Sequence, residues 1–311
     1  MLFDSLQSCW YAFGIEATNT MPYVYERNIP TSRGGTCLLI IDPQNDFHPG
    51  GSLGIPSADR DASRIAHMIE THLDQINEIY VTLDTHMKYH IAHGNFWVNI
   101  DGQHPSPFTN ITLEDIEKGL WRPARKEDGL DQWVRKYVGA LESQGRFTLT
   151  IWPEHCLIGS EGHAVRKIIR EALEKWETYK NSCVQYVFKG NNSYTEHYSA
   201  IRAEVIRDSD KNTCLNEALV KQLQLHDKVL VCGQAKSHCV NFTVRDLVEN
   251  WDSNKLDKLV LLEDGMSPVT GFEDAGDQFI KDMDEKGLTI SKTSQALSIY
   301  NASQLRDTRR V

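Results

Sequence analysis

The chain has 311 residues, of which 40% are apolar and 24% are charged, and this is enough for a globular domain with a substantial core. Its formal net charge is −10 and its pI is about 5.6, which argues against non-specific binding to nucleic acid or to anionic membranes, because both need a basic surface. No apolar run approaches the roughly 20 residues that span a bilayer.

The seven cysteines are odd in number, irregularly spaced and without a CxxC pair. This pattern is typical of neither a disulfide framework nor a zinc ribbon, and it favours a reducing compartment. The opening stretch MLFDSLQSCWYAF has no basic region, so we expect no secretory signal. We therefore expect a cytoplasmic protein, and the sequence leaves open whether it forms a homo-oligomer.

The first half of the chain alternates between predicted strands and helices. Residues 1–35 lack strong periodicity and are expected to form an extension. Apolar runs and helical spacing then predict a strand over 36–42, a helix near 58–76 and a strand over 78–84. Residues 85–150 are long for one crossover. We interpret the part from about 98 to 147 as an insertion beside the site, with helices over 112–119 and 129–142.

The second half is more regular. Its helices are predicted over 161–176, 214–225, 239–250 and 272–286, and its strands over 184–189, 228–233, 258–263 and 288–291. Such alternation predicts a doubly wound α/β fold with a mainly parallel sheet and helices on both faces. We expect one domain over 36–300, followed by a tail over 301–311.

Reactive side chains stand at the ends of four predicted strands. TCLLIID ends on Asp42, EIYVTLD ends on Asp84, VQYVFK ends on Lys189, and KVLVCG leads through QAKSH to Cys239. In an open parallel sheet the ligand crevice lies beyond the carboxyl ends of the strands. We therefore expect these groups to meet in one cleft, where they can supply a nucleophile, its base and a charge partner.

Cys239 stands at the predicted start of a helix. There the free amides and the helix dipole favour a thiolate, so we expect a lowered thiol pKa. The alternative is a small buried hydrophobic residue. Taken alone, Asp42 is typical of a turn before proline, and Lys189 is typical of a solvated strand end. The combination of Asp42, Lys189 and Cys239 favours a catalytic role. We expect the neighbouring His238 to be structural, because adjacent side chains at a helix start diverge.

Histidines gather in the segment that would cover the cleft. Asp84 and His86 are followed by His90 and His93, and Trp152-Pro153-Glu154-His155 comes later. Carboxylate and imidazole together suit zinc, iron or manganese. We expect one divalent metal ion, zinc in the first place. The GxSxG, GxGxxG and phosphate-loop patterns are absent from the sequence, which removes the main support for a serine hydrolase or a nucleotide-binding protein.

Five motifs in one order resemble the nicotinamidase branch of the isochorismatase-like cysteine hydrolases. They are DPQNDFHPGGSL at 42–53, DTHMKYHIAHGNFW at 84–97, WPEHCLIGSEG at 152–162, FKG at 188–190 and GQAKSHCV at 233–240. The resemblance covers residues 36 to 290. It departs from the family pattern at Thr85, at Lys236-Ser237 and in the size of the insertion.

The resemblance implies a role for each matching residue. Cys239 would be the nucleophile, Asp42 the general base and then acid, and Lys189 their partner. The amides of Ala235 and Cys239 would form an oxyanion hole, with a cis peptide between Gln234 and Ala235. The metal ligands would be Asp84, His86, His155 and His93, with His90 as the alternative to His93. Phe47 and Trp152 would hold a flat aromatic ring.

The resemblance implies a small amide as the substrate, and deamidation of nicotinamide to nicotinate and ammonia as the reaction. One alternative is a related amidase for a carbamoyl or ureido compound, but family members of that kind generally lack the metal histidines. A non-catalytic protein of the same fold is another alternative. Against it stands the presence of Asp42, Lys189 and Cys239 together.

Overall fold

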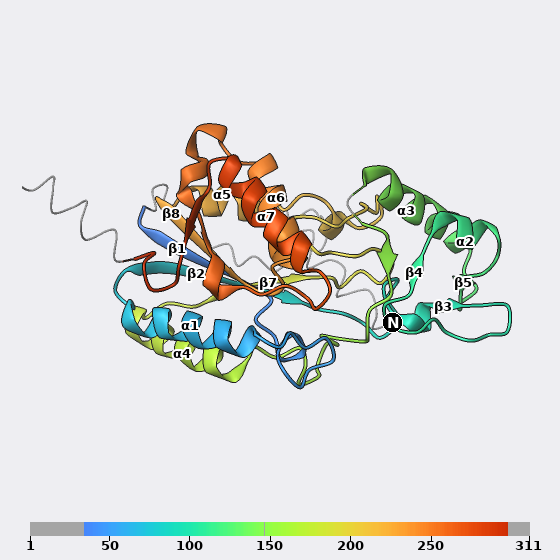
Figure 1. Ribbon diagram of the computed structural model, residues 1–311, viewed down its shortest axis with the longest axis horizontal. Helices are drawn as coiled ribbons and strands as arrows, with labels where there is room; N and C mark the ends of the chain where they lie inside the picture. The colour runs from blue at the N-terminus through green and yellow to red at the C-terminus, as the bar shows by residue number, and fades with distance from the viewer. Residues whose placement is uncertain (1–33, 146, 298–311) are drawn as a thin grey trace, which may run out of the picture. The chain divides into compact units, whose positions relative to one another are not determined.

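The computed structural model describes residues 34–145 and 147–297 (Figure 1). The expected extension, apart from its last two residues, and the expected tail lie outside the described residues. The described strands are β1 (Thr36–Ile41), β2 (Ile76–Asp84), β3 (Trp97–Val98), β4 (Asn110–Ile111), β5 (Arg122–Pro123), β6 (Leu149–Thr150), β7 (Gln185–Lys189), β8 (Lys228–Gly233), β9 (Leu259–Leu262) and β10 (Thr289–Ser291). The α-helices are α1 (Ala58–Thr71), α2 (Leu113–Glu117), α3 (Leu130–Gln144), α4 (Lys167–Lys180), α5 (Glu217–Gln224), α6 (Cys239–Glu249) and α7 (Glu273–Glu285).

Six parallel strands form the central sheet, in the order β10-β9-β8-β1-β2-β7. The chain runs outward from β1 through β2 to β7, and then returns to the other side of β1 with β8. The strand order therefore reverses between β1 and β8, and a ligand crevice is expected where these two strands end. The predicted fold class is confirmed.

Alternate residues of β1 face two different layers. Leu38 and Ile40 pack in one apolar cluster with residues of α1 and α4, whereas Leu39 and Ile41 pack in the other. In α1, Ile65, Met68 and Ile69 recur at helical spacing and are buried. Figure 1 shows α1 and α4 together on one face of the sheet, and α5, α6 and α7 on the other.

The insertion shares the core of the domain. Buried residues of α3, such as Val134, Tyr137 and Leu141, belong to the same apolar cluster as Leu39 and Ile41 of β1. Two short antiparallel pairs, β3 with β5 and β4 with β6, close the insertion onto itself. No helix in residues 34–145 and 147–297 has the length and apolar character that a membrane crossing needs.

The helix predicted over 161–176 begins later, at Lys167. The preceding segment is instead tied by backbone hydrogen bonds to the loop after β1. Asn45 N donates to Ala164 O at 2.9 Å, and Arg166 N donates to Pro43 O at 2.7 Å. These pairings use backbone groups that a helix would need for itself, so tertiary contacts set the start of α4.

Candidate active site

Three buried side chains from different strand ends meet at the carboxyl edge of the sheet. Asp42 follows β1, Lys189 ends β7, and Cys239 begins α6 after β8. Lys189 Nζ lies 2.8 Å from Asp42 Oδ2 and 3.6 Å from Cys239 Sγ. The structure thus brings together the three groups that the strand ends predicted.

Lys189 also joins this group to a second carboxylate. Its Nζ lies 3.0 Å from Asp84 Oδ1, and it donates a hydrogen bond to His197 O at 2.9 Å. Burial opposes the charge of Lys189, but the carboxylates of Asp42 and Asp84 outweigh burial and raise its pKa well above the usual value. The side chain therefore remains an ammonium between two carboxylates.

Asp42 has the properties of a base held in place. Burial raises its pKa, and the Lys189 ammonium offsets only part of this rise. Its Oδ1 accepts a hydrogen bond from the hydroxyl of Thr82, and its own amide donates to the same hydroxyl at 3.0 Å. Asp42 also has φ of 42°, a left-handed conformation that is uncommon for aspartate and is often found at functional sites.

The thiol of Cys239 differs from the expectation drawn from the helix start. Cys239 is the first residue of α6, as predicted, but it is only 5% exposed. Burial raises its pKa well above the ordinary value; Lys189 opposes this rise, whereas Asp42 adds to it. The expected lowered pKa is therefore wrong, because desolvation outweighs the helix dipole here. The resting group is a thiol beside a buried carboxylate.

The loop before Cys239 contains the cis peptide between Gln234 and Ala235 that the resemblance implies. Ala235 and Cys239 line the same pocket. The amide of Cys239 belongs to the first turn of α6, so it has no acceptor inside its own helix. Both backbone amides are candidates for an oxyanion hole.

Three histidines next to Asp84 share one hydrogen-bonding pattern. The Nδ1 atoms of His86, His93 and His155 lie 3.0, 3.4 and 2.8 Å from the backbone carbonyls of Gly190, Lys88 and Pro153. A carbonyl only accepts, so each Nδ1 carries a proton. Each Nε2 is thereby left to hold a metal. Side-chain nitrogens of the three lie within 4.8 Å of one another, and Asp84 Oδ2 is 3.0 Å from His86 Nε2.

His90 has the opposite arrangement. Its Nδ1 accepts a hydrogen bond from Ala92 N at 3.2 Å, so in the neutral ring the proton is on Nε2. Burial lowers the pKa of His90 well below its usual value, so the ring is neutral. A protonated Nε2 cannot bind a metal. The geometry therefore favours His93 over His90 as the additional ligand.

The pocket beside Cys239 brings together aromatic residues and two candidate metal ligands. It is lined by Phe47, Leu53, Asp84, Trp152, His155, Glu196, Tyr198, Ala235, His238, Cys239 and Val269. Phe47 and Trp152 are both present, as the resemblance implies. Glu196, Tyr198 and His238 were missed or set aside from the sequence. The motif TEHY after β7 could have indicated Glu196 and Tyr198, because it places a carboxylate and a phenol shortly after Lys189.

None of the described residues of the insertion, 98–145 and 147, lines this pocket, so they act on it indirectly. The ring of Phe108 packs edge-on against Trp152, with centroids 5.9 Å apart. The hydroxyl of Tyr137 accepts a hydrogen bond from Glu196 N at 3.2 Å, and Trp133 Nε1 donates to Tyr194 O at 2.8 Å. The insertion thus supports the segment that carries Glu196.

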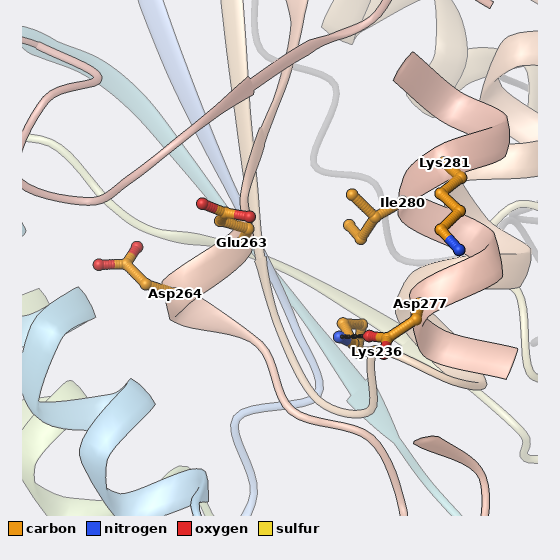
Figure 2. Close-up of a pocket in the computed structure, with 6 residues that line it drawn as sticks. All are labelled: Lys236, Glu263, Asp264, Asp277, Ile280 and Lys281. Carbon is orange, nitrogen blue, oxygen red and sulfur yellow. Dashed lines mark hydrogen bonds and ion pairs between the residues drawn. The ribbon is translucent and has the colours of Figure 1, made fainter. Parts of the chain in front are cut away.

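A second hollow lies elsewhere, between the short helix Glu263–Gly265 and α7 (Figure 2). It is lined by Lys236, Glu263, Asp264, Asp277, Ile280 and Lys281. Figure 2 shows Lys236 turned toward Asp277, and the two side chains form an ion pair at 2.8 Å. This hollow contains neither the thiol nor the histidines, so we place the chemistry in the pocket beside Cys239.

No protein-family model matches the sequence. A curated relative, the nicotinamidase of Escherichia coli, is 26% identical over 216 residues, which are 68% of this chain and 76% of the relative. Among solved structures, an Acinetobacter baumanii nicotinamidase/pyrazinamidase has a TM-score of 0.57 at 19% identity and covers 85% of this chain and 99% of its own. The yeast nicotinamidase bound to the inhibitor nicotinaldehyde also has a TM-score of 0.57, at 20% identity, and covers 83% and 99%. These two structures share the fold. The five motifs and this relative make the chain similar to the nicotinamidase branch of the isochorismatase-like cysteine hydrolases, and the two structures have the same fold.

Proposed function

We propose that the protein is a metal-dependent cysteine amidohydrolase that converts nicotinamide into nicotinate and ammonia through a thioester on Cys239. One observation carries this proposal: the ammonium of Lys189 lies 2.8 Å from the carboxylate of Asp42 and 3.6 Å from the thiol of Cys239, and Cys239 lines the pocket. The aromatic rings of Phe47 and Trp152 in the same pocket suit a flat heteroaromatic amide.

The first half of the reaction forms the thioester. Asp42 takes the proton of the Cys239 thiol as the sulfur attacks the carboxamide carbon, and the carbonyl π bond becomes an oxyanion. The amides of Ala235 and Cys239 hydrogen-bond to this oxygen. Asp42 then returns the proton to the nitrogen. The C–N bond breaks, ammonia leaves and the carbonyl re-forms.

The second half returns the enzyme to its starting state. Asp42 takes a proton from a water molecule, whose oxygen attacks the thioester carbon. The C–S bond breaks, nicotinate is released and the sulfur regains a proton. Lys189 keeps its positive charge beside Asp42 throughout, which holds the carboxylate in place between the two proton transfers.

The donor set fits a divalent ion. Asp84, His86, His93 and His155 would hold it, since they offer one carboxylate and three imidazole Nε2 atoms from one buried cluster. A bound ion would supply a Lewis acid that binds and orients the ring nitrogen of the substrate. Zinc suits this set best, and iron or manganese would also fit it.

The test is ammonia release from a panel of small amides, with metal analysis of the same protein sample. We expect release from nicotinamide and its loss in Cys239→Ala, with circular dichroism showing that the variant folds. Wild-type protein that hydrolyses ureido or carbamoyl compounds and leaves nicotinamide intact would contradict the proposed substrate. Full activity in a chelator, after metal removal has been verified, would contradict the metal dependence.

A further inference from the structure

His238, set aside from the sequence as structural, lines the pocket directly beside Cys239. Its ring is held by three aromatic rings. The ring centroids of Trp152, Tyr198 and Phe272 lie 5.2, 5.3 and 4.7 Å from that of His238, at interplanar angles of 90°, 64° and 77°. Edge-to-face packing of this kind fixes the ring plane, so the two ring nitrogens keep separate environments.

One ring nitrogen is occupied by Ser237. The Ser237 hydroxyl oxygen accepts a hydrogen bond from Val269 N at 3.1 Å and lies 2.8 Å from His238 Nδ1. Ser237 is buried, and within residues 34–145 and 147–297 its hydroxyl contacts no other hydrogen-bonding atom. Its single proton is satisfied only if it goes to His238 Nδ1. Nδ1 is therefore an acceptor, and the proton of the neutral ring is on Nε2.

The ring stays neutral in the working range of pH. Burial lowers the pKa of His238 to about 4, and no carboxylate offsets this effect. His238 thus offers one N–H donor, at Nε2. Among the described residues no hydrogen-bond acceptor is found for Nε2, and the ring itself lines the pocket. A donor left in this position is available to a ligand.

We propose that His238 Nε2–H determines specificity by donating a hydrogen bond to an acceptor atom of the substrate ring, next to the carbon that bears the carboxamide. The proposal rests on the proposed function and names its substrate class more closely. Cys239 must reach the carboxamide carbon, so the atoms nearest to the adjacent His238 are the ring positions that flank this carbon. Among heteroaromatic carboxamides, those with a ring nitrogen or another acceptor at such a position gain this hydrogen bond, whereas nicotinamide, which has a C–H there, is bound without it.

Nicotinamide and pyrazinamide form a matched pair of probes. They have the same shape, but pyrazinamide has a nitrogen in place of a C–H next to the carbon that bears the carboxamide. The experiment measures the ratio of kcat/KM for pyrazinamide to kcat/KM for nicotinamide. We expect His238→Phe to lower this ratio about fivefold to tenfold, the worth of one neutral hydrogen bond. His238→Gln, which keeps an N–H donor at a similar reach, should restore most of the ratio.

Equal losses on both amides would overturn the proposal, because His238 would then act only as a wall of the pocket or on the carboxamide itself. A second measurement does not depend on turnover. Nitrogen-15 NMR of the wild-type ring, assigned by its disappearance in His238→Gln, should show a protonated Nε2 and an unprotonated Nδ1. The reverse pattern would refute the donor. If wild-type protein hydrolyses neither amide, the proposed function fails, and the NMR result alone decides whether His238 is a donor.

Discussion

At the scale of single residues, the proposed nucleophile Cys239 depends on its neighbours for activation, because its thiol is not intrinsically acidic. Burial disfavours the thiolate of Cys239, and the same burial makes Asp42 a stronger base than an exposed carboxylate. The proton of the thiol therefore has a nearby destination when a substrate arrives. This combination keeps the free enzyme in the thiol form, which is less open to oxidation and alkylation.

A raised thiol pKa predicts the pH dependence of Cys239 alkylation. Below the raised pKa the group is a thiol and reacts slowly; above it the thiolate forms and the rate reaches a plateau. We expect the midpoint for iodoacetamide to lie above that of a free thiol, about 8.5. Site-resolved mass spectrometry must follow the Cys239 peptide, since Cys183 and Cys214 are exposed and also react. A midpoint at or below that of a cysteine-containing reference peptide would contradict the raised pKa.

The two tautomers predict unequal roles for His90 and His93. Both side chains are fully buried, so His93→Ala and His90→Ala remove equal bulk. His93→Ala should weaken zinc binding by more than about tenfold, because loss of even an outer partner of a metal ligand typically costs 10- to 100-fold. His90→Ala should have a much smaller effect. Calorimetric titration of the isolated variants measures both, and a larger loss in His90→Ala would reverse our assignment.

The sequence identified the charged members of the site better than the pocket walls. Asp42, Lys189 and Cys239 stand at strand ends, where parallel topology alone brings them together. His238 was set aside because neighbouring side chains diverge at a helix start. That argument did not anticipate that Cys239 and His238 would line the same pocket. Glu196 and Tyr198 lie in a loop without periodicity, so only their position shortly after Lys189 pointed to them.

At the scale of elements, backbone geometry at the end of β7 shapes the proposed metal-binding cluster. Gly190 has φ of 77°, and a Cβ there would lie 2.6 Å from Asp84 Oδ1 and 2.9 Å from His86 Cε1. Its carbonyl oxygen lies 3.0 Å from Nδ1 of His86 and accepts a hydrogen bond from that nitrogen. A glycine is therefore required both for the turn after Lys189 and for the close approach of Asp84 and His86.

This geometry predicts that Gly190→Ala both destabilises the fold and weakens metal binding. Gly102→Ala is the matched control, because Gly102 has φ of 78° and nothing lies within 4 Å of its added Cβ. Backbone strain alone should cost each variant about 1 kcal/mol or somewhat more. Only Gly190→Ala should also lose zinc affinity. Urea unfolding and zinc titration separate the two effects, and equal zinc affinity in both variants would show that the predicted clash is relieved.

The bounds of most helices, and of most strands in the central sheet, were predicted within a few residues, because their apolar periodicity is strong. The start of α4 was not, since backbone pairing with the loop after β1 holds residues 161–166 out of the helix. The short pairs β3–β5 and β4–β6 have only two residues per strand, which is too few for any period to show. Local sequence predicts elements well where they are long and amphipathic.

At the scale of the whole molecule, the reversal of strand order between β1 and β8 brings the reactive side chains together. Asp42 and Cys239 come from the two sides of this switch point, while Asp84 and Lys189 come from β2 and β7. The residues are up to 197 positions apart in sequence, from 42 to 239, yet they form one buried cluster. The fold class could be predicted from strand and helix alternation. The insertion's support of the 194–198 segment could not, because it depends on long-range packing.

The most direct test of the account is the trapping of an acyl-enzyme. Wild-type protein mixed with excess nicotinamide and quenched in acid within the first turnover should contain a nicotinoyl thioester on the Cys239 peptide, identified by mass spectrometry. The adduct should be absent from Cys239→Ala, which should release no ammonia above background. Ammonia release by Cys239→Ala at the wild-type rate, or an adduct on any other residue, would contradict covalent catalysis by Cys239.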